Sequence, residues 1–254
     1  MVENIFLAFV IYSFLGWISE VIFAFYKHGK FVNRGFLHGP FCPIYGIGVV
    51  LTTSLLDDFK GNIIILFVLS VLITSILEYA TGYCLEVFFK STWWDYSNKK
   101  FNIGGKVCLA FSLLWGVACL FIVLAVNPIV NYTIVSFNNF LGVYKTLFLQ
   151  LIFLYFWTDF IMTLVSLYGF KNILKSIQDI KFKYEEDLAK LRANANISLE
   201  ELSQLKNDFK LKEEAIFGRV TANQRRLVSS FPNISTKSYK IIGNIKKLIN
   251  DFEK

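Results

Sequence analysis

The chain has 254 residues, of which 55% are hydrophobic and 17% aromatic, and its formal net charge is +7. With 27 Phe against 4 Pro, this composition excludes an ordinary soluble domain and predicts an all-α, polytopic membrane helix bundle. Its basic residues are interleaved with acids and no recognition motif accompanies them, so nucleic-acid binding is not expected.

Five apolar runs approach the roughly 20 residues that cross about 30 Å of hydrocarbon as a helix. The second run is the shortest and opens on Pro40 and Pro43, so a full crossing and a re-entrant segment are both open. The first run carries Glu3 and Glu20 without a basic leader, so we do not expect a cleavable signal peptide. The predicted spans cover residues 4–25, 41–56, 62–89, 107–126 and 146–170.

The charges of the loops predict how this bundle is oriented. Basic residues gather in the loops after the first and third spans. The loop after the second span holds two acids and one lysine, and the loop after the fourth span holds one lysine. By the positive-inside rule, the amino terminus lies outside the cell membrane and the chain after residue 170 lies in the cytoplasm. The basic loop residues are Lys27, Lys30, Arg34, Lys90, Lys99, Lys100 and Lys106.

Four acids lie inside the predicted spans: Glu20, Glu78, Glu86 and Asp159. An ionised side chain near the bilayer centre costs roughly 3 kcal/mol or more unless it faces a polar interior. Glu78 and Glu86 are eight positions apart, which places them about 80° from one another on a helix, with Gly82 between them. We therefore expect both to face one cavity.

A structural role remains the alternative for each acid, which would then be paired with a cation, a Trp or a hydroxyl group that fixes the helix register. For Glu20 and Asp159 the two roles are left open, and Glu20 is close enough in sequence to meet Arg34 or Lys27. For Glu78 and Glu86 the functional role is favoured, because two acids on one face double the cost of burial.

The two predicted cytoplasmic loops are rich in glycine and aromatic residues. In the first, residues 33–48, prolines and glycines free backbone amides that bind an anion, with Arg34 adding charge and His38 a titratable group. A tight turn between helices explains the same residues equally well. In the second, Trp93, Trp94 and Tyr96 are typical of a membrane interface. That reading leaves Asp95 and Asn102 less well explained.

The segment from residue 171 onward is predicted to be a basic helical or coiled-coil tail, distinct from a transmembrane domain over residues 1–170. It holds 17 Lys and Arg against 11 Asp and Glu, a net charge of +6. Apolar residues at three and four spacing predict a helical hairpin, with a break at 194–196 and a capping box at 198–201. A short basic helix is expected over 236–252. Intramolecular packing is favoured over a coiled-coil dimer through residues 171–222, because the apolar stripe drifts towards a 3.6-residue period.

Several motifs together resemble a known family. In chain order they are Gly16-Trp17 with Glu20, residues 33–48, residues 78–82 with Leu85-Glu86, Trp94-Asp95-Tyr96-Ser97, Phe101-Asn102, Gly105, and residues 112–116. Residues 1–125 resemble the bacterial CmpB-like family labelled "putative ABC-transporter type IV permease", and the tail is not covered. This resemblance implies a multi-pass, permease-like protein of the cell membrane. The segment Gly104-Gly105-Lys106-Val107 lacks the first glycine and the hydroxyl residue of a P-loop, so any ATPase must be a separate chain.

Metal and cofactor chemistry is not expected from this chain. The cysteines stand singly in or beside spans with no C-x-x-C pairing, and the two histidines are ten residues apart in one loop. The residues concerned are Cys42, Cys84, Cys108, Cys119, His28 and His38.

Three functions remain open. The first is a transporter subunit in which Glu78, Glu86 and Asp159 line a path. The second is a membrane-embedded enzyme acting on a lipid or polyprenyl-linked substrate, with Glu20, Glu78 or Glu86 as acid or base and Arg34, His38 and Lys106 holding a phosphate. The third is a scaffold that recruits partners through its tail. The candidate cavity-lining residues are Glu20, Arg34, His38, Glu78, Glu86, Asp95, Asn102, Lys106, Ser112, Trp115 and Asp159.

Overall fold

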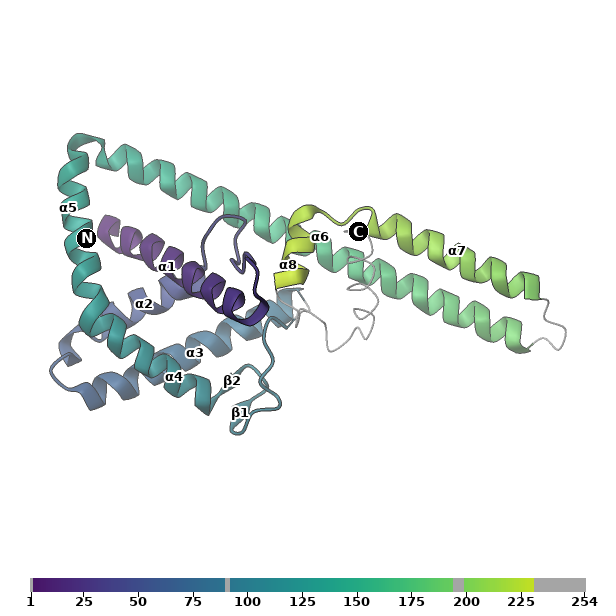
Figure 1. Ribbon diagram of the computed structural model, residues 1–254, viewed down its shortest axis with the longest axis horizontal. Helices are drawn as coiled ribbons and strands as arrows, with labels where there is room; N and C mark the ends of the chain where they lie inside the picture. The colour runs from purple at the N-terminus through teal and green to yellow at the C-terminus, as the bar shows by residue number, and fades with distance from the viewer. Residues whose placement is uncertain (1, 90–91, 194–198, 231–254) are drawn as a thin grey trace. The chain divides into compact units, whose positions relative to one another are not determined.

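The computed structural model describes residues 2–89, 92–193 and 199–230, and this part of the chain is almost entirely helical (Figure 1). Short 3₁₀ turns follow α2 and α5, and a π-helical turn, Ile122–Val126, joins α4 to α5. The helices are α1 (Val2–His28), α2 (Pro43–Leu55), α3 (Ile63–Phe89), α4 (Leu109–Phe121), α5 (Asn127–Leu141), α6 (Lys145–Ala193), α7 (Leu199–Phe217) and α8 (Ala222–Ser230). Two short antiparallel strands, β1 (Asn102–Ile103) and β2 (Val107–Cys108), complete the described elements.

The chain divides into two compact units, and the boundary falls inside α6 between Thr163 and Leu164. Nearly all of the first unit is the chain up to Thr163, and the second consists mainly of the rest of α6 with α7 and most of α8. The predicted domain boundary after residue 170 stays a prediction.

Helix pairs in the first unit approach closely where a glycine removes a side chain. α1 packs on α2, and a Cβ added at Gly46 would lie 2.3 Å from Ser13 Oγ and 2.5 Å from the Phe9 carbonyl oxygen. α3 packs on α4, and a Cβ at Gly116 would lie 2.4 Å from Val71. Small residues at helix contacts are typical of bundles in lipid, where dispersion rather than hydrophobic burial holds helices together.

A buried apolar cluster connects α1 and α2 with α5 and the first turns of α6. Its members are Leu7, Tyr12, Val49, Val130, Ile134 and Leu149. Large apolar side chains cover the outer faces as well, for example Ile64 and Ile76 on α3, which are 76% and 68% exposed. In the described residues, three helical stretches are long and apolar enough to cross a membrane: Val2–Lys27, Ile63–Phe89 and Leu109–Leu191.

Two predicted spans differ from the structure. α2 has 13 residues, about 20 Å of helix, because Pro43 starts it and it ends at Leu55. It is shorter than the hydrocarbon thickness, so a full crossing by residues 41–56 is not shown. The fourth predicted span was expected to end at Val126. Instead, helix continues to Leu141, because a π-helical turn accommodates the missing N–H of Pro128.

In the second unit, the ring of Tyr184 on α6 packs on Phe209 of α7, with centroids 4.6 Å apart. Gln224 of α8 donates a hydrogen bond to the Ser166 carbonyl oxygen of α6 at 2.8 Å. The capping residue Ser198 and the helix expected over 236–252 lie outside the described residues.

Candidate functional site

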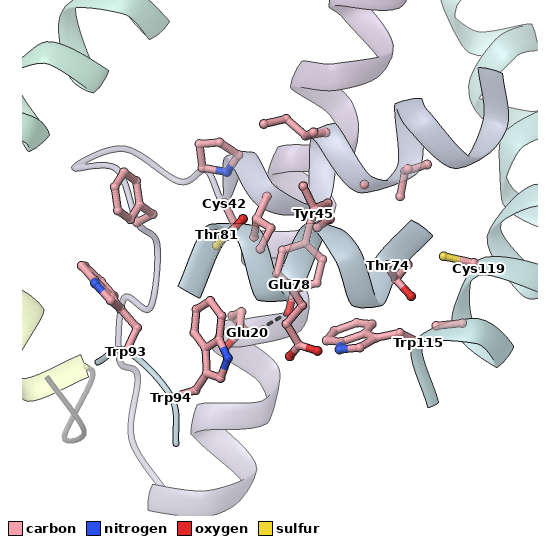
Figure 2. Close-up of a pocket in the computed structure, with 18 of the residues that line it drawn as sticks. Glu20, Cys42, Tyr45, Thr74, Glu78, Thr81, Trp93, Trp94, Trp115 and Cys119 are labelled. Carbon is pink, nitrogen blue, oxygen red and sulfur yellow. Dashed lines mark hydrogen bonds between the residues drawn. The ribbon is translucent and has the colours of Figure 1, made fainter. Parts of the chain in front are cut away.

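A cavity of about 380 Å³ lies in the first unit, walled by α1, α2, α3, α4 and the loops that precede α2 and β1 (Figure 2). Its lining is mostly apolar and aromatic, which is typical of a small-molecule pocket. The polar exceptions are few: two carboxylates, one guanidinium, and hydroxyl and thiol groups. Its lining residues with polar or aromatic side chains are Glu20, Arg34, Phe36, Cys42, Tyr45, Thr74, Glu78, Thr81, Trp93, Trp94, Tyr96, Trp115 and Cys119.

The carboxylate of Glu78 is the buried charge of this cavity. The residue is 8% exposed, and its Oε1 accepts a hydrogen bond of 3.1 Å from the hydroxyl of Tyr96. The Trp115 indole lies beside the carboxylate and interacts favourably with it, while Oε2 is buried and makes no hydrogen bond of good geometry within the described residues (Figure 2). A buried acceptor without a partner is costly, so Glu78 is the lining residue whose carboxylate has the most to gain from a ligand.

Tyr96 reaches Glu78 because the loop that carries it is folded by its own side chains. The Asp95 carboxylate accepts hydrogen bonds from the backbone N–H and the hydroxyl of Ser97. The Asn102 amide donates to two carbonyl oxygens of the loop and accepts from the Gly105 N–H. Asp95 and Asn102 therefore have structural roles that explain them.

Tyr96 remains a hydrogen-bond donor at physiological pH. Burial, followed by the neighbouring Glu78 carboxylate, raises the pKa of the Tyr96 hydroxyl well above its usual value. The ring also stacks on Phe111, with centroids 4.7 Å apart, which fixes its direction.

On another wall, Glu20 is held by two partners. Its Oε1 accepts a hydrogen bond of 2.6 Å from the Tyr45 hydroxyl, and its Oε2 lies 3.2 Å from Nε of Arg34. Arg34 is one of the two cations that the sequence offered as a partner for Glu20. This ion pair ties α1 to the loop before α2, while Tyr45 ties α1 to α2 itself.

The pair predicts a measurable coupling between Glu20 and Arg34. Each side chain is about one quarter exposed or less, so we expect Glu20→Gln and Arg34→Gln each to destabilise the protein. The double variant should lose less stability than the sum of the two single losses, and the difference, the interaction free energy, should be about 1 kcal/mol. Thermal unfolding of the four proteins in lipid nanodiscs measures it, and exactly additive losses would contradict a direct interaction.

Of the eleven residues proposed from the sequence, the structure places four on this cavity: Glu20, Arg34, Glu78 and Trp115. Glu86 is not among its lining residues; its carboxylate forms an ion pair of 2.5 Å with Lys106. Ser112 accepts a hydrogen bond of 2.8 Å from Ser75, between α4 and α3.

Asp159 and His38 meet at a separate place. The Asp159 carboxylate accepts hydrogen bonds from the backbone N–H groups of His38, at 2.9 Å, and Gly39, at 2.8 Å. Nδ1 of His38 lies 3.2 Å from the same carboxylate and 3.1 Å from the Thr163 hydroxyl. Asp159 therefore anchors the loop before α2 to α6.

Among the cavity residues that were not proposed from the sequence are Tyr45 and Tyr96, which donate hydrogen bonds to its two carboxylates. Both lay inside motifs that were noticed, but an aromatic residue near a membrane interface gives no signal of its partner. In the described part of the chain, no three His, Cys, Asp or Glu side chains gather as a metal site would require.

Comparison with known proteins found no match among curated proteins and no match among solved structures. A family model described as "Putative ABC-transporter type IV" matches residues 7–164. The match covers more than half of the chain, ends next to the boundary of the first unit at Thr163, and includes every residue of the cavity. The chain therefore belongs to the CmpB-type family of putative ABC transporters of type IV.

Proposed function

We propose that this chain is a permease-like subunit of a membrane transporter and that the cavity bounded by Glu20 and Glu78 receives its substrate. The supporting observation is the carboxylate of Glu78, a largely buried residue that lines this cavity of about 380 Å³ and whose Oε2 makes no hydrogen bond within the described part of the chain. A protein selected for stability alone would gain by replacing such a group with an apolar one. Its presence is accounted for by a ligand that satisfies it.

The family and the apolar helices support a membrane setting. Within it we propose five crossings, with the amino terminus outside, the tail in the cytoplasm, and a separate ATPase subunit. The distribution of Lys and Arg among the loops supports this orientation. Association of copies through residues 171–222 stays a prediction.

The path proposed from the sequence is revised by the contacts of its acids. Glu86 is paired with Lys106, and Asp159 is occupied by the backbone of the loop before α2. We therefore assign them to holding the cytoplasmic loops, and Glu78 to substrate.

The enzyme alternative requires cations that are available to a phosphate. Each of the three proposed cations faces an acid instead: Arg34 faces Glu20, Lys106 faces Glu86 and His38 faces Asp159. A phosphate would have to displace a carboxylate at each position, which makes transport the better-supported function. The scaffold alternative places function in the tail and gives the cavity no role.

Accessibility of Thr81 from the two sides of the membrane tests the proposal without a known substrate. Thr81 lines the cavity on α3. In a background in which the four native cysteines are replaced, Thr81→Cys would be exposed to small membrane-impermeant methanethiosulfonates, one cationic and one anionic. A permease opens its cavity to each side in turn, so labelling is expected in both right-side-out and inside-out vesicles.

Ile76→Cys is the matched control, because Ile76 is on the same helix but 68% exposed on its outer face. It should resist the reagents in both preparations, since lipid covers it. Labelling of Thr81→Cys from one side only would favour an enzyme at that leaflet and contradict the permease. No labelling from either side would favour the scaffold.

A further inference from the structure

The walls of the cavity are unusually rich in aromatic rings. Tyr45 comes from α2, Trp93 and Trp94 from the loop before β1, and Trp115 from α4 (Figure 2). Tyr96, from the same loop as the two tryptophans, lines the cavity as well. Tyr45 and Trp115 form a T-shaped pair, with ring centroids 5.6 Å apart and planes at 78°. The faces of such rings carry partial negative charge and attract cations, most strongly where water is excluded.

The formal charges of the lining favour a cation too. The described lining residues include three charged side chains: Glu20, Arg34 and Glu78. Glu20 and Arg34 neutralise one another at 3.2 Å. The charge of Glu78 is left over, so an anion would be repelled and a neutral ligand would leave the carboxylate uncompensated.

The geometry of Glu78 holds its carboxylate in one orientation at the wall of the cavity. Tyr96 donates to Oε1 and is itself held by its stacking on Phe111, so the carboxylate has a fixed orientation. Oε2 is buried, and no described residue forms a hydrogen bond with it. A single uncompensated carboxylate among mostly apolar walls does not suit a divalent metal, which needs several oxygen ligands. It suits a single positive charge that carries apolar substituents.

We infer that the cavity binds an organic ammonium ion, with its charge beside the carboxylate of Glu78 and its apolar substituents against the aromatic walls. This inference rests on the proposed function for the location of the substrate site and names the class of substrate. The bound cation would compensate the buried carboxylate, and cation–π contacts with the rings would add to the affinity.

Binding of simple ammonium ions to the purified full-length chain in lipid nanodiscs tests the inference. The probes are tetraethylammonium, and choline with its neutral isostere in which a quaternary carbon replaces the nitrogen. Calorimetry should show binding of both cations and weaker binding of the isostere, accompanied by a change in tryptophan fluorescence. Glu78→Gln keeps the shape of the side chain and removes its charge. It should weaken the binding of both cations by about tenfold or more.

Glu86→Gln is the matched control, because it removes a carboxylate from the same helix outside the cavity lining. It should change the affinity by less than about twofold. If Glu78→Gln does not fold, Trp115→Leu replaces it and should weaken choline more than the isostere. The inference is overturned if neither cation binds at millimolar concentration, if the isostere binds as tightly as choline, or if Glu78→Gln binds like the natural chain.

Failure of this inference is distinguishable from failure of the proposed function. Glu78-dependent ammonium binding, with Thr81→Cys labelled from one side only, supports the ligand class and contradicts the permease. If Thr81→Cys is labelled from both sides and no ammonium ion binds, the permease is supported and the organic ammonium ion is ruled out as its substrate class.

Discussion

Replacement of Asp159 by alanine is expected to lower the free energy of unfolding by about 3 kcal/mol, because it removes two charge-assisted hydrogen bonds at once. The side chain is 7% exposed and accepts from the backbone N–H groups of His38 and Gly39. No other acceptor replaces it when the side chain is truncated to a methyl group. Thermal or denaturant unfolding of the protein in nanodiscs measures the loss.

Two further variants separate this role from a general effect of removing charge. Asp159→Asn retains an oxygen that accepts one of the two N–H groups and should lose about half as much stability. Asp57→Ala removes an acid that is 64% exposed and should lose less than about 0.5 kcal/mol. An Asp159→Ala protein as stable as the natural chain would show that the carboxylate does not anchor the loop.

Gly46→Ala is expected to cost about 3 kcal/mol, at the upper end of the range for overpacking, although it adds one methyl group. The added Cβ would lie 2.5 Å from the Phe9 carbonyl oxygen, which belongs to the backbone of α1 and does not rotate away. α1 and α2 would have to separate, which would also shift Glu20 relative to Tyr45. The expected result is a lower unfolding midpoint.

Gly61→Ala serves as the control, because a Cβ at Gly61 meets nothing within 4 Å. It should leave stability unchanged or raise it slightly by reducing the freedom of the unfolded chain. Equal stability of the two variants would contradict the close approach of α1 and α2.

The fold was predictable where one physical signal dominates. The lengths of α1 and α3 follow from uninterrupted apolar runs, whereas the break expected at 194–196 lies outside the described residues. The continuation through Pro128 was not predictable, because a proline ordinarily ends a helix and the π-helical turn that accommodates it has no sequence signature.

The site was predictable to the extent that burying an acidic side chain costs free energy. That argument singled out Glu20 and Glu78, which line the cavity. It failed to separate Glu78 from Glu86, because a difference of about 80° on a helix is enough to bury one acid and turn the other towards Lys106. The contact of Asp159 with His38 joins residues 121 positions apart, and periodicity along the chain carries no information about it.

Reaction of the native chain with dicyclohexylcarbodiimide tests most directly whether Glu78 is an uncompensated carboxylate in an apolar cavity. The reagent is apolar and reacts with carboxyl groups that lie in apolar sites, whereas a carboxylate held by a neighbouring cation is expected to be unreactive. Mass spectrometry of peptides is expected to find the adduct on Glu78 and not on Glu20 or Glu86, with less adduct when tetraethylammonium is present. An unmodified Glu78, or equal modification of Glu86, would contradict the account.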